Sequence, residues 1–164
     1  MKALLVTGLF TGYLPVAPGT WGSAAVAAIY LLVAWGSGGR QVCLTGTMAV
    51  IAVAFSVICL ALGRFAEETF GRKDPSQVSA DEWAGQAVAL IMLPLGGAPA
   101  DVWLAVGVAF VAFRVMDIVK PPPANGLQRL KGGLGILIDD LVAGVYANLL
   151  AQLVLRCVAR ASCP

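Results

Sequence analysis

The sequence predicts an all-α protein, a compact bundle of about five membrane-spanning or membrane-embedded helices that forms one domain over residues 1–164. Hydrophobic residues make up 59% of the chain and charged residues 12%, against roughly 45–50% and about 25% in soluble domains. The mean hydropathy is +0.86. Long apolar runs alternate with a few short polar clusters. These observations exclude a disordered chain, a charged nucleic-acid binder and most soluble enzymes.

Five apolar segments are long enough to form helices in or across a membrane. A spanning helix needs about 20 largely apolar residues. We expect helices over residues 21–35, 42–63, 83–95, 99–119 and 134–155. The second and fifth segments are expected to span cleanly, whereas the other three are shorter or interrupted by charges and could be tilted or partly interfacial.

The first two helices follow from the turn residues around them. Residues 1–10 are expected to be retained, because no cleavage site follows before Pro15 and Pro18. Residues 15–23, PVAPGTWGS, form a rigid turn that opens the helix over 21–35, and Thr20 or Ser23 is expected to cap it. The second segment, residues 42–63, carries no charge at all.

The remaining three helices each carry polar residues near one end. The helix over 83–95 ends near Pro94, and Trp83 is expected to anchor it at the membrane interface. Prolines at 121–123 stop the helix over 99–119, and Asn125-Gly126 predicts a turn after it. The last helix, over 134–155, carries Asp139 and Asp140 near its start.

Basic residues are distributed unequally between the two sides that five crossings would create. One side receives Lys2, Arg64, Arg72, Lys73, Arg114, Lys120, Arg129 and Lys131, and the other receives Arg40, Arg156 and Arg160. Cytoplasmic loops carry the excess of Lys and Arg in membrane proteins. The first side is therefore predicted to be cytoplasmic, with the termini on opposite sides.

Several classes of chemistry are excluded by composition. The chain has no histidine, which removes every mechanism that needs an imidazole. A net charge of +2 is too small to indicate a nucleic-acid partner. None of the four cysteines forms a C-x-x-C pair, so a zinc or redox motif is not expected.

Four polar clusters lie on the predicted cytoplasmic side. The first contains Pro18, Gly19, Thr20 and Ser23, at a helix N-terminus whose free N–H groups suit a phosphate. A plain capped loop is the alternative. In the second, Asp81 and Glu82 open the third helix, where acidic residues can also serve only to cap.

The third and fourth clusters lie on otherwise apolar helices. Arg114, Asp117 and Lys120 are spaced by three and share one helix face, as in a surface ion-pair ladder or a binding site. Asp139 and Asp140 are expected within the membrane, near the start of the last helix. Ionisable residues inside a membrane are usually functional. A small polar stripe continues from Asp140 at every fourth residue, through Gly144, Asn148 and Gln152.

The clusters suggest chemistry on a phospholipid phosphate. Carboxylates without histidine or cysteine select a hard cation, and beside a phosphate that cation is Mg²⁺. Arg114 and Lys120 can contact phosphate oxygens. A small transporter or channel subunit with cation-binding aspartates is the alternative. Transporters place such charges near the midplane on broken helices, which discriminates the two hypotheses.

The motifs PVAPGTWGS, SADEWAGQ, FRVMDIVKPPP and GGLGILIDDLVAG occur in an order and spacing that resembles the phosphatidylglycerophosphatase A family. The resemblance extends from about Gly12 to Asn148. It implies a Mg²⁺-dependent lipid phosphatase of the bacterial cytoplasmic (inner) membrane, multi-pass, with its active site facing the cytoplasm. Its substrate would be phosphatidylglycerophosphate and its lipid product phosphatidylglycerol.

The resemblance also implies roles for individual residues. Catalytic roles are implied for Asp81, Asp117, Lys120, Asp139 and Asp140, metal binding for Asp81, Glu82, Asp139 and Asp140, and substrate binding for Arg114 and Lys120. Substrate binding is expected of Pro18, Gly19, Thr20 and Ser23 as well, from their place at a helix N-terminus. The sequence leaves open whether an aspartate or a metal-activated water attacks phosphorus. It also leaves open the oligomeric state.

Overall fold

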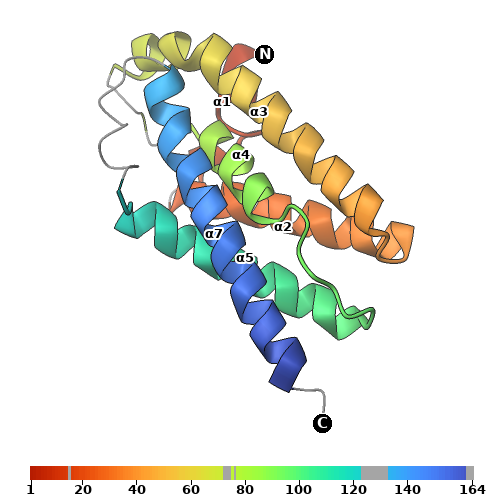
Figure 1. Ribbon diagram of the computed structural model, residues 1–164. Helices are drawn as coiled ribbons and strands as arrows, with labels where there is room; N and C mark the ends of the chain where they lie inside the picture. The colour runs from red at the N-terminus through yellow and green to blue at the C-terminus, as the bar shows by residue number, and fades with distance from the viewer. Residues whose placement is uncertain (15, 72–74, 76, 123–132, 162–164) are drawn as a thin grey trace.

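A computed structural model describes the protein over residues 1–14, 16–71, 75, 77–122 and 133–161. Within these residues the chain is helical and contains no strand (Figure 1), which confirms the all-α prediction. The helices are α1 (Lys2–Val6), η1 (Thr11–Tyr13), α2 (Pro18–Ser37), α3 (Gln41–Phe70), α4 (Ala80–Ala89), α5 (Pro99–Val119) and α7 (Gly133–Ala161).

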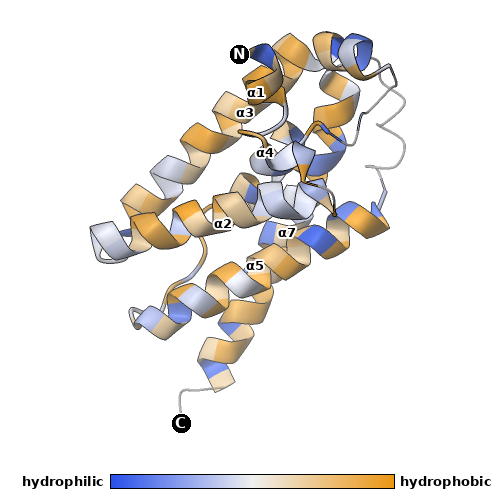
Figure 2. Ribbon diagram, turned by 180° about the vertical axis from the view of Figure 1, so that it is seen from behind, coloured by the Kyte–Doolittle hydropathy of each residue, from blue (hydrophilic) through white to orange (hydrophobic). Residues whose placement is uncertain are grey.

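Four of the described helices, α2, α3, α5 and α7, are long and apolar enough to cross a membrane. Hydrophobic residues run along these long helices in Figure 2. Only two helices were expected to span cleanly. The difference arises because α2 begins at Pro18 and reaches 20 residues, and because the charges of α5 lie close to its two ends.

The third segment to pass through the bundle, around residues 79–95, is only partly helical. The sequence predicted a helix over 83–95, but α4 has 10 residues, about 15 Å, or half of a hydrocarbon core. At its start, the Ser79 N–H donates to the Val6 carbonyl (3.2 Å). Beyond its end, the Leu93 carbonyl accepts a hydrogen bond from Gln41 Nε2 (3.1 Å), at the beginning of α3. The chain therefore passes from one end of the bundle to the other between Ser79 and Leu93.

A side chain from α7 stabilises the point where α4 ends. Pro94 disfavours helical geometry at the preceding residue, and Met92 has a φ of 52°. Asn148 Nδ2 donates to the carbonyls of Ala89 (3.0 Å) and Ile91 (2.7 Å). Gln152 Nε2 in turn donates to Asn148 Oδ1 (2.8 Å). The predicted polar stripe thus satisfies backbone carbonyls that have no water to bind inside a membrane.

Two glycines allow α4 and α7 to pack backbone against backbone. A Cβ atom at Gly144 would overlap the Gly85 carbonyl oxygen, and one at Gly85 would lie 2.6 Å from the Asp140 carbonyl oxygen. Small residues permit such close approach of helices in membranes. This contact brings Asp140 on α7 next to the first turns of α4.

Trp83 does not anchor α4 at an interface, so that prediction was wrong. Its side chain is only 4% exposed. It stacks on Phe55 of α3, with ring centroids 4.6 Å apart, and its Nε1 donates to Thr11 Oγ1 (3.4 Å). The tryptophan is buried because α4 is enclosed by the longer helices.

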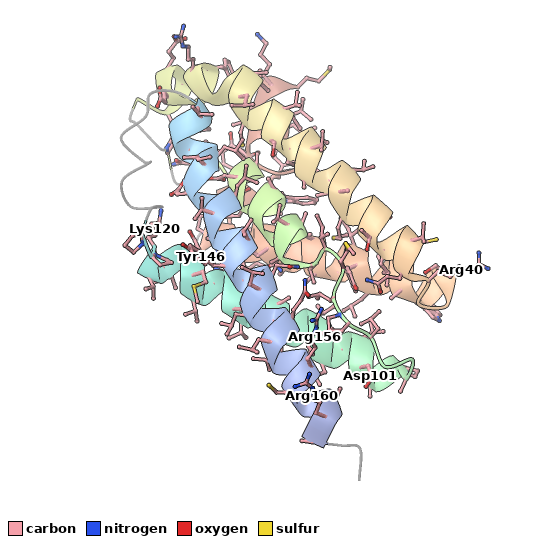
Figure 3. The ribbon with its side chains drawn as sticks, in the orientation of Figure 1. Arg40, Asp101, Lys120, Tyr146, Arg156 and Arg160 are labelled. Atoms are coloured by element: carbon pink, nitrogen blue, oxygen red, sulfur yellow. The ribbon has the colours of Figure 1, made fainter. Side chains whose placement is uncertain are left out.

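Polar groups gather at the two ends of the bundle. Figure 3 shows Lys120 at the end where α4 begins, while Arg40, Asp101 and Arg160 lie toward the other end. We call these the site end and the opposite end. Of the basic residues assigned to the predicted cytoplasmic side, Arg72, Lys73, Arg129 and Lys131 lie outside the described residues, as does the turn at Asn125-Gly126.

Candidate functional site

Three carboxylates from two helices meet at the site end. Asp81 and Glu82 occupy the first turn of α4, and Asp140 comes from α7. One oxygen atom from each lies within 4.8 Å of the others. We call Asp81, Glu82 and Asp140 the acidic group. Asp81 is 7% exposed and Asp140 4%, so these charges are largely removed from water.

Lys120 and Asp139 form an ion pair at the same end. Lys120 Nζ donates to Asp139 Oδ2 at 2.6 Å, which joins the end of α5 to α7. Burial lowers the pKa of Lys120, but the hydrogen bond and charge of Asp139, together with Asp140 and Asp117, outweigh it and raise that pKa above its usual value. Lys120 is therefore charged at neutral pH.

Arg114 and Asp117 form a second ion pair, one turn apart on α5. Arg114 Nη1 lies 3.1 Å from Asp117 Oδ2, and both side chains are mostly buried. Both charges also act electrostatically on Glu82. The predicted face of α5 therefore points toward the acidic group and is not a solvent-exposed ladder.

The beginning of α2 contacts the acidic group directly. Pro18 is the first helical residue, and a Cβ atom on Gly19 would overlap Glu82 Oε1. Only glycine lets the backbone approach that carboxylate so closely. The positive end of the α2 dipole thus faces Glu82.

The predicted cap of α2 was wrong. Ala17 holds the N-cap position with a φ of 48°, and no side chain caps the helix. Ser23 is buried and its Oγ donates to the Gly19 carbonyl (3.0 Å), within its own helix. Thr20 lies in the first turn and is half-buried. Among the four predicted phosphate-binding residues, Gly19 lies directly against Glu82 of the acidic group.

Sequence reasoning missed the residues that fix the start of α4. Ser79 and Glu82 have the spacing of a capping box, yet α4 has no side-chain cap bond. Ser79 Oγ instead lies 2.8 Å from Thr11 Oγ1, and Thr11 also accepts from Trp83. The S-x-x-E spacing was a usable signal for the helix start. The partner of Ser79, 68 residues away, was not visible in it.

The acidic group fits a hard divalent cation. All of its ligand atoms are carboxylate oxygens, the donors that Mg²⁺ prefers. Glu82 Oε2 and Asp140 Oδ2 are buried and have no hydrogen-bond partner among the described residues. Buried carboxylates so close together repel one another unless a cation or protons compensate them. Asp139, also predicted as a metal ligand, lies outside the acidic group and faces Lys120.

Comparisons with known proteins point in one direction. The model of the family described as Phosphatidylglycerophosphatase A matches residues 4–155. Two relatives named Phosphatidylglycerophosphatase A, from Haemophilus influenzae and Escherichia coli, are each 32% identical over 88% of this chain, covering 82% and 77% of their own lengths.

A further relative carries a different name. This protein of Bacteroides thetaiotaomicron has the provisional name phosphatidylinositol-3-phosphatase and is 34% identical over 92% of this chain and 91% of its own. No solved structure matches the chain.

Proposed function

Since the chain belongs to the phosphatidylglycerophosphatase A family, we propose that it is a Mg²⁺-dependent phosphatase that hydrolyses phosphatidylglycerophosphate to phosphatidylglycerol and phosphate. It is a phosphoric monoester hydrolase of a membrane-embedded, helical type. The observation that carries the proposal is the acidic group, which gathers two buried carboxylates and a half-buried one beside two ion pairs at one end of the bundle.

Asp81, Glu82 and Asp140 would hold the Mg²⁺ ion. When bound, the ion supplies positive charge that offsets the phosphate dianion and polarises its oxygens. The N-terminus of α2 beside Glu82 adds a positive dipole at the same place. Buried carboxylates and aligned helix ends keep this charge arrangement fixed before the substrate arrives.

Lys120 and Arg114 would bind the oxygens of the phosphate. Asp139 holds the Lys120 ammonium in place, and Asp117 does the same for the Arg114 guanidinium. We therefore assign Asp139 and Asp117 as positioning residues for these two cations. In the reaction, water replaces the lipid alkoxide on phosphorus, and that alkoxide leaves with a proton as the primary alcohol of phosphatidylglycerol.

The position of the charges favours a hydrolase over a transporter. The third crossing is broken, as in transporters, but its break is occupied by Asn148 and backbone carbonyls. The acidic group lies instead at the beginning of α4, at the site end. We propose that this end faces the cytoplasm of a bacterial inner membrane, where the excess of basic residues belongs.

The Bacteroides relative makes phosphatidylinositol 3-phosphate the second candidate substrate. Both lipids are phosphate monoesters on a glycerophospholipid, so the same acidic group could act on either. Purified protein in detergent should release phosphate from phosphatidylglycerophosphate faster than from phosphatidylinositol 3-phosphate or phosphatidic acid. The reverse order would assign the chain to the second activity.

Metal dependence is tested by EDTA and by one matched pair of variants. Phosphate release should stop with EDTA and return with added Mg²⁺. Asp140→Asn should reduce kcat/KM by about a hundredfold or more, because a lost ligand weakens charge stabilisation by several kcal/mol. Asp101→Asn, at the opposite end, keeps an oxygen that accepts the Ala98 N–H and should behave as wild type. Undiminished turnover in EDTA would contradict the proposal.

A further inference from the structure

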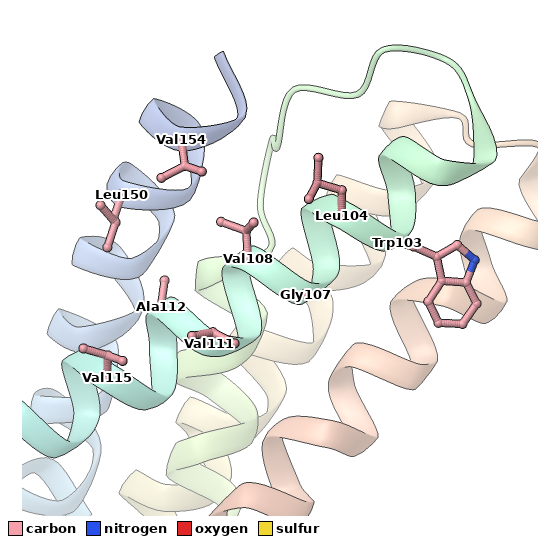
Figure 4. Close-up of a pocket in the computed structure, with 9 residues that line it drawn as sticks. All are labelled: Trp103, Leu104, Gly107, Val108, Val111, Ala112, Val115, Leu150 and Val154. Atoms are coloured by element: carbon pink, nitrogen blue, oxygen red, sulfur yellow. The ribbon is translucent and has the colours of Figure 1, made fainter. Parts of the chain in front are cut away.

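An apolar groove runs along the outer surface between α5 and α7 (Figure 4). Its volume is about 590 Å³. Trp103, Gly107, Val111 and Val115 line it from α5, and Leu150 and Val154 line it from α7. The α5 residues recur at every fourth position, so they form one continuous stripe on the helix. The groove therefore follows α5 toward the site end.

The same face of α7 connects this groove to the site. Asp139, Tyr146, Leu150 and Val154 are separated by seven, four and four residues, which places them on one face of the helix. Asp139 binds Lys120, and the Tyr146 hydroxyl donates to the carbonyl of Pro122 (2.9 Å), two residues beyond Lys120. A molecule that contacts Lys120 with a charged group can therefore extend its apolar part along this face.

The length of the groove indicates what occupies it. From Trp103 to Val115 the α5 stripe covers about 18 Å, against about 15 Å for the hydrocarbon of one leaflet, half of a 30 Å core. A second spanning helix would use about twice that length. It would also favour a small residue four positions from Gly107, where the chain has Trp103 and Val111.

We propose that the α5–α7 groove binds an acyl chain of the lipid substrate while its phosphate lies at Lys120 and the acidic group. The inference rests on the proposed lipid phosphatase activity. A second apolar cavity, of about 760 Å³, lies between the end of α2 and the start of α5. It shares Trp103 with the groove but lies at the opposite end, away from the phosphate-binding residues.

Gly107 permits a direct test. A Cβ atom at Gly107 meets nothing within 4 Å, so a leucine there projects into the groove without displacing a neighbour. Gly46 on α3 is the matched control, because it is also an exposed helical glycine with open space around its Cβ position. Gly107→Leu and Gly46→Leu make the same chemical change inside and outside the groove.

The experiment compares dioleoyl with dihexanoyl phosphatidylglycerophosphate in detergent micelles. For Gly107→Leu, the ratio of kcat/KM for the long-chain lipid to that for the short-chain lipid should fall about fivefold or more, because lost acyl contacts weaken only the longer substrate. Gly46→Leu should leave the ratio at the wild-type value. A photoactivatable long-chain analogue should label α5 and α7 in the wild type, and Gly107→Leu should reduce that labelling.

Three results would overturn the inference. The first is an unchanged ratio in Gly107→Leu, and the second is an equal loss for both chain lengths. The third is a halved mass by light scattering in Gly107→Leu but not in Gly46→Leu, which would assign the groove to a second copy of the chain. Failure of the proposed function gives a different result, since wild-type protein would then release no phosphate from either lipid.

Discussion

Lys120 combines an uncommon backbone conformation with a short ion pair. Its φ is 46°, a left-handed value that is unfavourable for a residue with a Cβ atom and that typically costs about 1–3 kcal/mol. Pro121 follows directly and restricts the backbone further. The 2.6 Å contact with Asp139 holds the side chain against α7. Both backbone and side chain are therefore fixed in a way that a membrane anchor does not require.

We expect Lys120→Arg to insert normally and to lose about tenfold in kcat, because a planar guanidinium replaces a compact ammonium at the proposed phosphate site. Lys120→Ala should lose about a hundredfold, since the charge itself is gone. Initial-rate kinetics at saturating Mg²⁺ measure both.

Lys2→Arg is the control for the Lys120 variants. Lys2 lies at the same end of the bundle but over the ring of Phe65, away from the acidic group, so its replacement should leave kcat unchanged. Full activity of Lys120→Arg, with Lys120→Ala reduced only in expression, would show that Lys120 is merely an anchor.

The sequence grouped Asp139 and Asp140 together as metal ligands and did not predict that they have different neighbours. Asp139 and Asp140 could not be told apart, because adjacent residues on a helix point about 100° apart and only the rotation of α7 decides which faces α4. That rotation is set by the contact of Gly144 with Gly85, 59 residues earlier in the chain. No local pattern contains this information.

At the scale of helices, α4 depends on its neighbours for both of its ends. Thr11 and Ser79 fix its start, and Asn148 bonds to the carbonyls of Ala89 and Ile91 at its end. The sequence suggested a longer helix over 83–95, because Leu90 to Leu93 are apolar and give no local stop signal before Pro94. The side-chain amide of Asn148, far along the chain, allows α4 to end earlier, at Ala89.

We expect Asn148→Leu and Asn148→Asp to destabilise the protein by about 1–3 kcal/mol, because neither side chain can donate to the two carbonyls. Thermal unfolding in a mild detergent measures the change. Leu149→Ala is the control: Leu149 is adjacent but 60% exposed on the outer surface, so its truncation should change the melting temperature little. Wild-type stability of Asn148→Asp would rule out the donor role of Asn148.

At the scale of the whole molecule, five passages connect the two ends, although only four described helices are long enough to span alone. The segment between Ala89 and Pro99 completes the third passage and lies beside Gly38 and Gly39, at the end of α2. The predicted number of passages follows from hydropathy. The mixed character of the third one does not.

Cysteine labelling tests the arrangement of the passages. In a variant without native cysteines, Ala98→Cys should react with a membrane-impermeant maleimide on intact cells, because its loop lies at the opposite end. Glu68→Cys, at the site end of α3, should react only after permeabilisation. Both positions are exposed, so access to the reagent depends on the side of the membrane. If both cysteines were equally protected from the reagent on intact cells, the third passage would not cross the membrane.

The short third helix has a consequence for how the chain is made. A helix of 10 residues with Asp81 and Glu82 in its first turn is too short and too charged to insert readily into a membrane by itself. The amide that satisfies its last carbonyls is 57 to 59 residues further along, near the middle of α7. During synthesis we therefore expect α4 to remain at the bilayer surface, or within the insertion machinery, until α7 has been made. The acidic group, which needs Asp140 of α7, is then assembled only after α7 has been made.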